Sequence, residues 1–289
     1  MSDPLSSFLE ALDLTDTGAR TSEDILTGPS QWQPQGRVFG GQVLAQSLIA
    51  AGRTVEEGRG VHSMHGYFLR PGDVTLPITF SVDRIHDGRS FCTRRTQAYQ
   101  NGQPILSMIA SFQTDDEGLD HQTPMPEGVP DPDTLPSAAD VLAGVDHPVG
   151  TFWATQRPFD VRHVEQPVYL RADPQRVAHQ CVWMRALGPL PDGAMLHRAA
   201  LAYASDYTIL ESTLRWHGAA WTTPGLRIAS LDHAMWWHRP ARVDDWLLYV
   251  QEAPSASGGR GLSLGRIYSR DGSLVASVAQ EGMIRVPLA

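Results

Sequence analysis

The chain has 289 residues, of which 42% are hydrophobic, so it can form one large domain or two smaller ones with substantial cores. It carries 23 Lys plus Arg against 32 Asp plus Glu, which gives a net charge of −9. This acidic balance argues against nucleic acid or an anionic membrane as a partner, although a local group of arginines can still bind a small anion.

The two cysteines, Cys92 and Cys181, lie in β-like runs and have no motif spacing. They support neither a disulfide framework, a zinc site nor a redox pair, and we expect a reducing compartment. The first residues form an acidic amphipathic stretch without the basic region and apolar core of a signal peptide, and no apolar run reaches the length of a membrane span. We therefore expect a cytoplasmic protein without a membrane span.

In the first half of the chain, helical patterns are followed by a run of strands. Residues 5–13 predict a short leading helix, and residues 40–55 predict an apolar helix after a turn region rich in Gly, Pro and Gln. Turn sequences such as Asp87-Gly88 separate four strand candidates: residues 61–69, 78–85, 91–99 and 105–112. A helix followed by antiparallel strands is an α+β pattern.

From residue 115 to about 157, repeated prolines interrupt an acidic stretch, which predicts a linker or a loosely packed connection. The second half then repeats the pattern of the first. Strand material in residues 166–184 is followed by an apolar helix in residues 196–212 and by four strand candidates: residues 226–238, 246–253, 261–268 and 274–283. Arg239-Pro240 follows the first of these strands as Arg70-Pro71 does about 170 residues earlier.

We therefore predict two fused copies of one domain. The predicted divisions are a leading helix in residues 1–20, an N-terminal domain in 21–115, a proline-rich linker in 116–160 and a C-terminal domain in 161–289. Each copy has an apolar surface and free strand edges that pairing with the other copy would cover. The remaining sheet edges make further assembly into a homo-oligomer a reasonable expectation.

The helix predicted in residues 196–212 is apolar nearly all round, as expected of a buried helix. Asp206 lies in its middle and shares a face with Tyr203 and Leu210. A buried ionised carboxylate is costly without partners, so a buried Asp206 requires hydrogen-bond donors close by. The alternative is an Asp that caps a helix segment or faces water.

Nine short motifs between about residues 38 and 285 give this chain a specific resemblance outside its proline-rich middle. It resembles the type II acyl-CoA thioesterases of the double hotdog fold, in which a long helix is wrapped by an antiparallel β-sheet in each of two fused copies. In order, the motifs are FGGQ, HSMHGYFLRPGD, DGRSFCTRR, ASFQ, YASD, SLDHAMWWHRP, WLLY, SASGGRG and DGSLVASVAQEG.

The resemblance implies a catalytic set of Asp206, Ser230 and Gln280, without a metal or organic cofactor. The family often has Thr where this chain has Ser230; either hydroxyl can make the same hydrogen bond, but Ser is freer about its first torsion. The chemistry of these residues fits, because a carboxylate can take a proton from water while the hydroxyl and the amide fix that water. Direct attack by Asp206, giving a mixed anhydride, is a possible alternative.

Asp232 competes with Asp206 for the role of base. If residues 226–238 form an unbroken strand, Ser230 and Asp232 share one face, whereas a bulge would change the alternation. The other interpretation of Asp232 is a carboxylate bonded to local backbone. Metal binding by histidines is not expected, because His62 and His65, like His233 and His238, are separated by odd numbers of positions.

Several residues are candidates for contacts with the substrate. Gln42 in FGGQ is the first-half residue that best parallels Asp206; it is neutral and cannot act as a base, so we expect one complete site per chain. His65 could line a cleft, and Arg94, Arg95 and Arg260 could bind the phosphates of coenzyme A. Each of these residues also has a purely structural interpretation.

We thus expect a hydrolase that releases a free fatty acid and coenzyme A from acyl-CoA. Two alternatives remain at this point: a hydratase or dehydratase acting on acyl thioesters with an Asp/His pair, and a non-catalytic acyl-CoA binding protein. The presence of Asp, hydroxyl and Gln at all three matching positions favours hydrolysis.

Overall fold

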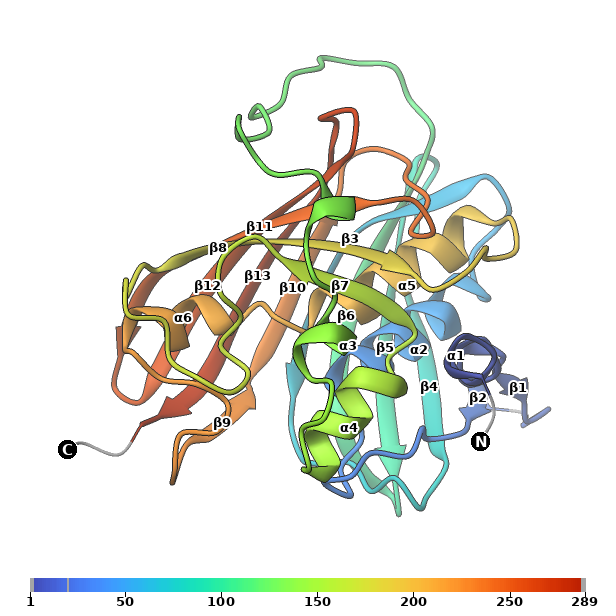
Figure 1. The fold of residues 1–289 in the computed structure, drawn as a ribbon. Helices are drawn as coiled ribbons and strands as arrows, with labels where there is room; N and C mark the ends of the chain where they lie inside the picture. The colour runs from blue at the N-terminus through green and yellow to red at the C-terminus, as the bar shows by residue number, and fades with distance from the viewer. Residues whose placement is uncertain (1–2, 20, 287–289) are drawn as a thin grey trace.

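The computed structural model describes residues 3–19 and 21–286, whose strands form one continuous antiparallel sheet (Figure 1). The strands of the N-terminal half are β1 Thr15–Asp16, β2 Asp24–Gly28, β3 Arg59–Phe68, β4 Ile78–Asp87, β5 Phe91–Gln100 and β6 Gln103–Thr114. Those of the C-terminal half are β7 Phe159–His163, β8 His179–Ala186, β9 Arg227–Ser230, β10 Asp232–Trp237, β11 Leu247–Ser257, β12 Arg260–Ser269 and β13 Leu274–Arg285.

The strand order shows that the two halves are copies of one arrangement. Outward from the middle of the sheet, the N-terminal half runs β3, β6, β5, β4, β2 and the C-terminal half runs β10, β13, β12, β11, β8. The halves meet where β3 and β10 pair antiparallel, from Tyr67 opposite Asp232 to Ser63 opposite Trp236. This pairing removes one free edge from each copy, and it confirms the predicted α+β double hotdog arrangement.

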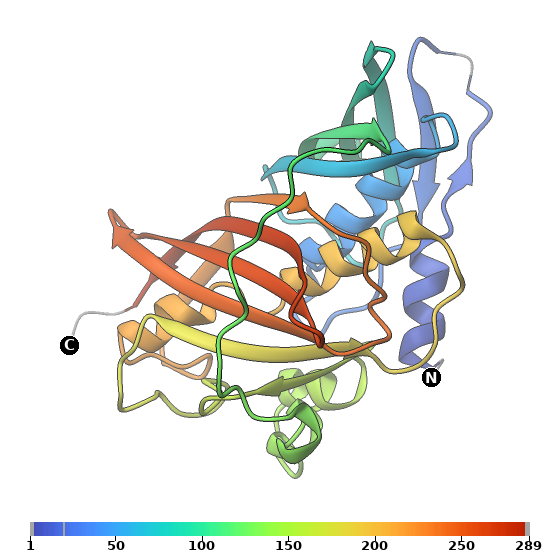
Figure 2. The same cartoon turned by 90° about the horizontal axis from the view of Figure 1, so that it is seen from above.

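Each half contributes one long buried helix, α2 Gly40–Gly52 and α5 Ala194–Ser205, and these two helices pack against each other inside the curved sheet (Figure 2). Residues 41–51 of α2 are all buried, as its apolar pattern predicts. Small residues allow the close contact: a Cβ atom on Gly41 would overlap the carbonyl oxygen of Tyr203. The active site described below lies at one end of this helix pair.

The helix predicted over residues 196–212 is in fact broken. Helix α5 ends at Ser205, Asp206 is its C-cap, and a separate short helix, α6 Glu211–Trp216, begins after a turn. The carboxylate of Asp206 instead accepts a hydrogen bond from the first turn of α2. The continuous helix was predicted from the local sequence pattern. That pattern does not include the bond to Gly41, which is a tertiary interaction with a residue 165 positions away.

The proline-rich segment crosses over the C-terminal half of the sheet (Figure 2) and contains three short elements. Its side chains Met125, Val129 and Leu135 pack on a second apolar cluster on that face of the sheet, which includes Trp183 and Trp246. The elements are η1 Pro132–Thr134, α3 Ala138–Val141 and α4 Pro148–Thr155. The N-terminal helix α1 Pro4–Leu12 packs beside α2, and no helix in the described part of the chain is long and apolar enough to cross a membrane.

We expect Gly41→Ala to lower the free energy of unfolding by about 1–3 kcal/mol, because the added methyl group must push α2 and α5 apart. Urea denaturation followed by circular dichroism would measure the change. Gly118→Ala is the matched control, since a Cβ atom there meets nothing within 4 Å. Equal stability of the two variants would contradict the close packing of the helices.

Candidate active site

The carboxylate of Asp206 lies where the two halves meet and accepts hydrogen bonds from three different elements. The N–H of Gly41 on α2 donates to Oδ2 at 2.8 Å. Gln280 Nε2 on β13 donates to Oδ1 at 3.0 Å, and Ser230 Oγ on β9 lies 3.4 Å from the same oxygen. The structure therefore brings together Asp206, Ser230 and Gln280.

A β-bulge at Leu231 sets the direction of Ser230. Ser230 lies opposite Gly282 and Ala234 opposite Ala279, so four steps on the β9–β10 side (234 − 230) face three on β13 (282 − 279). Residues 226–238 therefore do not form an unbroken strand, and the condition under which Ser230 and Asp232 would share a face is not met. Asp232 lies outside the site and accepts a hydrogen bond from the N–H of Glu281 at 2.7 Å. The donor is a backbone group, as in its alternative interpretation, but it lies on β13, 49 positions away, and is not local.

The bulge also brings His233 to the inner face, where it orients the amide of Gln280. Gln280 Nε2 donates both to Asp206 and, at 2.8 Å, to Ser230 Oγ, so Oε1 faces His233 and accepts from Nδ1–H. His233 is fully buried, with Nε2 3.0 Å from Ser205 Oγ. Burial lowers the pKa of His233 to about 4, so the ring is neutral at physiological pH. Sequence reasoning considered this histidine only as a metal ligand, because the bulge was not visible in the pattern.

Burial raises the pKa of Asp206 to about 6, and the hydrogen bonds from Gln280, Gly41 and Ser230 offset only part of this effect. The carboxylate keeps a small exposed area towards a cavity. At neutral pH it is mostly ionised, yet it binds a proton more strongly than an ordinary Asp does. These are the properties of a general base.

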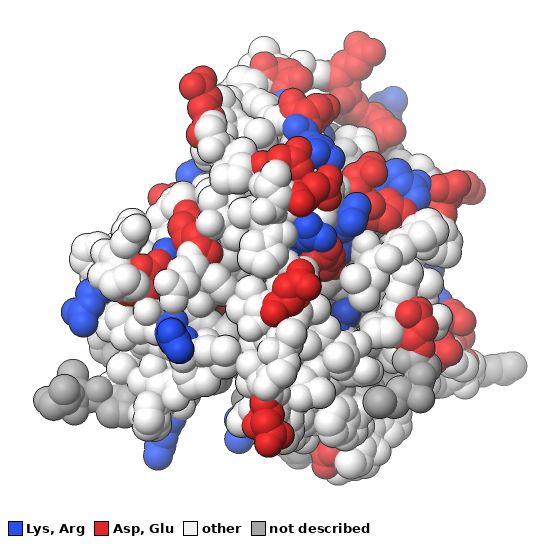
Figure 3. Space-filling model, in the orientation of Figure 1, with Lys and Arg blue, Asp and Glu red and all other residues white. Residues whose placement is uncertain are grey.

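The cavity next to Asp206 has a volume of about 580 Å³, and its walls come from three parts of the chain. The first is the loop that leads into α2, residues 33–40; the second is α4 with the two residues that follow it; the third comprises the end of α5 and strand β9. Figure 3 shows the surface indented at its lower edge, between β9 and α4. A neighbouring cavity of about 240 Å³ shares the lining residues Gln33, Phe152, Gln156 and Tyr203, so the two cavities lie side by side.

Gly40 forms the part of the wall closest to the carboxylate. A Cβ atom at this position would lie 2.7 Å from Asp206 Oδ2, so a side chain would collide with it. As the first residue of α2, Gly40 has an N–H without an acceptor inside the helix, at the positive end of the helix dipole. Gly40 and Asp206 thus line the same cavity, and a helix N-terminal N–H of this kind is a donor suited to a developing negative charge.

Gln42 is not part of this wall. Its amide is buried, donates to the carbonyl of Pro29 at 2.9 Å and to Gln46 Oε1 at 3.1 Å, and accepts from the N–H of Gln31. It holds the loop before α2 in place. By position in its helix, the residue that corresponds to Asp206 is Arg53, the C-cap of α2.

The other candidate contact residues also lie away from the cavity. His65 is exposed on the outer face of β3, with its ring centroid 5.1 Å from that of Trp236. Each of the three arginines forms an ion pair with a nearby carboxylate. The distances from guanidinium nitrogen to carboxylate oxygen are 2.5 Å for Arg94 and Asp87, 3.0 Å for Arg95 and Asp83, and 3.0 Å for Arg260 and Glu281. The arginines that do line the cavity are Arg37 and Arg157, which the sequence patterns did not single out.

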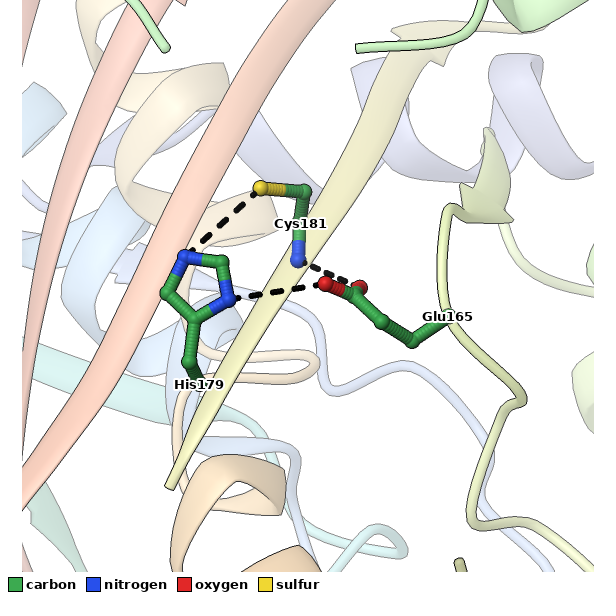
Figure 4. A group of neighbouring side chains, drawn as sticks. All are labelled: Glu165, His179 and Cys181. Carbon is green, nitrogen blue, oxygen red and sulfur yellow. Dashed lines mark hydrogen bonds and ion pairs between the residues drawn. The ribbon is translucent and has the colours of Figure 1, made fainter. Parts of the chain in front are cut away.

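Glu165, His179 and Cys181 form a separate polar cluster at strand β8 (Figure 4). Cys181 Sγ lies 3.9 Å from His179 Nε2, whereas the Glu165 carboxylate lies 3.5 Å from Nδ1 on the other side of the ring. The carboxylate and the thiol thus contact different nitrogens of one ring, although each of the three residues has a ligand atom within 4.8 Å of those of the other two. Burial also raises the pKa of the Cys181 thiol to about 12, so it is neither a ready ligand nor a nucleophile.

Comparison with known proteins shows the family to which the chain belongs. A family model described as acyl-CoA thioesterase matches residues 154–283, and one described as acyl-CoA thioesterase N-terminal domain matches residues 28–113. Acyl-CoA thioesterase 2 of Haemophilus influenzae is 36% identical over 99% of each chain.

Two solved structures resemble this one closely. The crystal structure of acyl-CoA thioesterase II TesB2 from Mycobacterium marinum has a TM-score of 0.80 and 45% identity, and the match covers 97% of this chain and 98% of that one. A hot dog fold protein of unknown function from Alicyclobacillus acidocaldarius, 22% identical with a TM-score of 0.79 over 98% of this chain and 99% of that one, shows the same fold. The chain therefore belongs to the acyl-CoA thioesterase family and has its double hotdog fold.

Proposed function

We propose that this protein hydrolyses fatty acyl-CoA to free fatty acid and coenzyme A by means of a water molecule that Asp206 activates. The observation that carries this mechanism is the partly desolvated carboxylate of Asp206, with a raised pKa, at the wall of a cavity of about 580 Å³. Family membership supports the reaction, and the geometry of the site supports the assignment of roles.

In the proposed reaction a water molecule is held between Asp206 and Ser230. Asp206 takes one proton of the water while the water oxygen bonds to the thioester carbon. The N–H of Gly40 stabilises the carbonyl oxygen as it becomes negative. The C–S bond then breaks, the coenzyme A sulfur leaves with the bonding electron pair, and the proton held by Asp206 passes to it.

Gln280 supports this reaction without contacting the substrate carbonyl. Its amide fixes one oxygen of Asp206 and the hydroxyl of Ser230, and His233 fixes the amide. Because three donors already hold the carboxylate, water activation is favoured over direct attack by Asp206 on the thioester.

The two alternative functions receive less support. A hydratase with an Asp/His pair needs a histidine that reaches the substrate, but His233 is buried and bonded to Gln280. A non-catalytic binding protein would gain nothing from a buried carboxylate with a raised pKa at its ligand cavity. A cytoplasmic location and assembly into a homo-oligomer stay predictions.

We expect Asp206→Asn to lower kcat by about 10²–10⁴-fold, because the amide cannot take a proton from water. Release of free thiol from acyl-CoAs of short, medium and long chain would measure the loss. Asp232→Asn is the matched control, since that carboxylate lies outside the cavity. Full activity in folded Asp206→Asn would place the base elsewhere, and absence of thiol release from every acyl-CoA by the wild-type protein would exclude hydrolysis.

We expect kcat/KM to rise with pH and to level off above a pKa of about 6. Only the ionised carboxylate of Asp206 accepts a proton, so activity is lost as pH falls through that value. His233 does not titrate in this range, because its pKa is about 4. A pH profile of thiol release from pH 4.5 to 8.5 tests this; activity that stays level down to pH 4.5 would be at odds with the assigned base.

We expect His233→Leu to lower kcat by roughly 10–100-fold, because Gln280 Oε1 loses its donor and the amide is no longer held towards Asp206. Loss of the bond from Gln280 should also move the midpoint of the pH profile upwards, since that bond lowers the pKa of Asp206. His233→Asn, which keeps an N–H close to the position of Nδ1, should restore part of the activity. An unchanged midpoint in His233→Leu would mean that His233 has only a structural role.

A further inference from the structure

The helix pair has a second end, opposite Asp206, where α5 begins and α2 ends. The two helices are in close contact there as well, because a Cβ atom on Gly52 would lie 3.0 Å from Met195 Sδ. A cavity of about 320 Å³ lies at this end, with Ala194, the first residue of α5, in its wall. Gly40, the first residue of α2, lies in the wall of the cavity at Asp206. The duplicated fold therefore has a cavity at the start of each central helix.

The cavity at the start of α5 lacks the groups proposed for hydrolysis. Arg53 takes the position of Asp206, since each is the C-cap of its helix. Val61 takes the position of Ser230, since each is the last residue before the bulge in its half of the sheet. This second cavity therefore has no carboxylate in the position of the proposed base, and a function for it has to come from other side chains.

Arg198 is a half-buried guanidinium in the wall of this cavity, without an ion pair or a hydrogen bond in the described part of the chain. It packs directly on the backbone of β3, where a Cβ atom on Gly60 would overlap Arg198 Nη1. Burial lowers the pKa of Arg198, and the charge of Asp115 opposes this effect only in part. The fold thus makes room for a cation whose charge is not compensated, which suits an anionic ligand.

The start of α5 supplies further donors beside Arg198. Its N-cap is Gly193, which has no side chain to cap the helix, and the first turn contains no acidic residue. In the described part of the chain, the N–H groups of residues 194–196 therefore have no acceptor, at the positive end of the helix dipole. Arg198 lies four residues after Ala194, on the same face of the helix, and lines the same cavity. Free N–H groups next to a guanidinium form an arrangement that binds phosphate.

An adjoining cavity of about 940 Å³ shares Ala194, Pro240 and Ala241 with the first and contains an unused donor of its own, His197. This side chain is 5% exposed. Its Nδ1 accepts a hydrogen bond from the N–H of Val243 at 3.2 Å, so the proton of the ring lies on Nε2. Nε2 is buried without a partner in the described part of the chain. An unpaired buried donor is costly, and an acceptor atom supplied by a ligand would remove that cost.

Arg185 is a second cation of the adjoining cavity without an ion pair in the described residues. Its Cζ lies 4.3 Å from the ring centroid of Trp246, which holds the plane of the guanidinium and leaves the N–H groups at its edge free. The other arginines of this cavity are paired with carboxylates: Arg239 with Asp120, Arg242 with Asp244 and Arg270 with Asp131.

Carboxylates also line the adjoining cavity, but donors of the protein hold two of them. Asp244 pairs with Arg242 at 2.8 Å, and Asp271 accepts a hydrogen bond from Ser269 Oγ at 2.6 Å. Asp245 is exposed to solvent, where water screens its charge. The groups that remain for a ligand in the two cavities are therefore mainly donors.

We propose that the start of α5 is a second ligand site, in which Arg198 and the N–H groups of residues 194–196 bind a phosphate group of a small phosphorylated molecule. Arg185 and His197 face the remainder of that molecule in the adjoining cavity. A phosphate is favoured over a carboxylate, because it offers more acceptor oxygens to donors that belong to both backbone and side chain. The site lies about 18 Å from Asp206 along α5, since a helix rises about 1.5 Å per residue. It is therefore separate from the cavity at Asp206, and the proposal does not depend on the thioesterase function.

Isothermal titration calorimetry of the full chain with inorganic phosphate and with ADP tests the site. We expect the wild-type protein to bind phosphate with a Kd on the order of 1 mM or lower. Arg198→Met should raise the Kd of both ligands by roughly 10–100-fold, the loss typical of a hydrogen bond to a charged group. Equal affinities for the two ligands would identify free phosphate as the ligand, whereas tighter binding of ADP would identify a nucleotide.

Arg84→Met is the matched control, because Arg84 is exposed and paired with Asp24 at 2.9 Å outside both cavities. It should leave both Kd values unchanged. Arg157→Met controls for binding in the cavity at Asp206, which Arg157 lines. The proposal is overturned if the wild-type protein shows no saturable binding of either ligand up to about 10 mM. It is also overturned if Arg157→Met abolishes binding and Arg198→Met does not.

Thermal melting checks the fold of each variant. If Arg198→Met does not fold, Ala194→Pro replaces it, because Pro is tolerated at the first position of a helix and removes one of the N–H donors. In the absence of phosphate, Arg198→Met should release thiol from acyl-CoA at the wild-type rate. Loss of thiol release with unchanged phosphate binding would overturn the proposal. Phosphate binding that depends on Arg198 in a protein that hydrolyses no acyl-CoA would support this site and reject only the hydrolytic function.

Discussion

The structure of the site depends on one constraint, the burial of the Asp206 carboxylate at the contact between the two central helices. A buried carboxylate needs donors, and here they come from both copies of the domain: Gly41 from the first, and Ser230 and Gln280 from the second. A single copy could not supply this set. The duplication of the domain therefore creates the site as well as covering the free sheet edge and apolar face of each half.

The same constraint explains the pair of glycines at the start of α2. Gly40 leaves room for the carboxylate, and Gly41 allows the two helices to approach until its own N–H reaches Oδ2. At the other end of the helix pair, the position that corresponds to Asp206 is held by Arg53, which binds Asp13 at 3.0 Å and the carbonyl of Leu14. The two ends of the helix pair thus differ in charge and in burial, because Arg53 is exposed whereas the carboxylate of Asp206 is held in the interior.

The segment between the copies breaks the symmetry further. Its last helix, α4, brings Trp153 and Arg157 to the cavity of Asp206. The proposed reacting groups, Asp206, Ser230 and Gln280, belong to the duplicated domains, whereas Phe152, Trp153, Gln156 and Arg157 of the cavity wall belong to the connection. In this arrangement, substitutions in the connecting segment can change which acyl groups fit without altering the groups that carry out hydrolysis.

The sequence by itself determined most of the central strands, the two buried helices and their duplication, because hydrophobic period and turn chemistry are local properties. It did not predict β1, β2 or β7, and only the last part of the strand material predicted in residues 166–184 forms a strand, β8. Family resemblance added Asp206, Ser230 and Gln280. Only the tertiary structure decided the rest: the bulge at Leu231, the helix break after Ser205, the contribution of α4 to the cavity, and the engagement of Gln42 by the loop before α2. Each of these depends on partners far away in the chain, such as β13 for the bulge and Gly41 for the break, and a pattern of neighbouring residues contains no record of such partners.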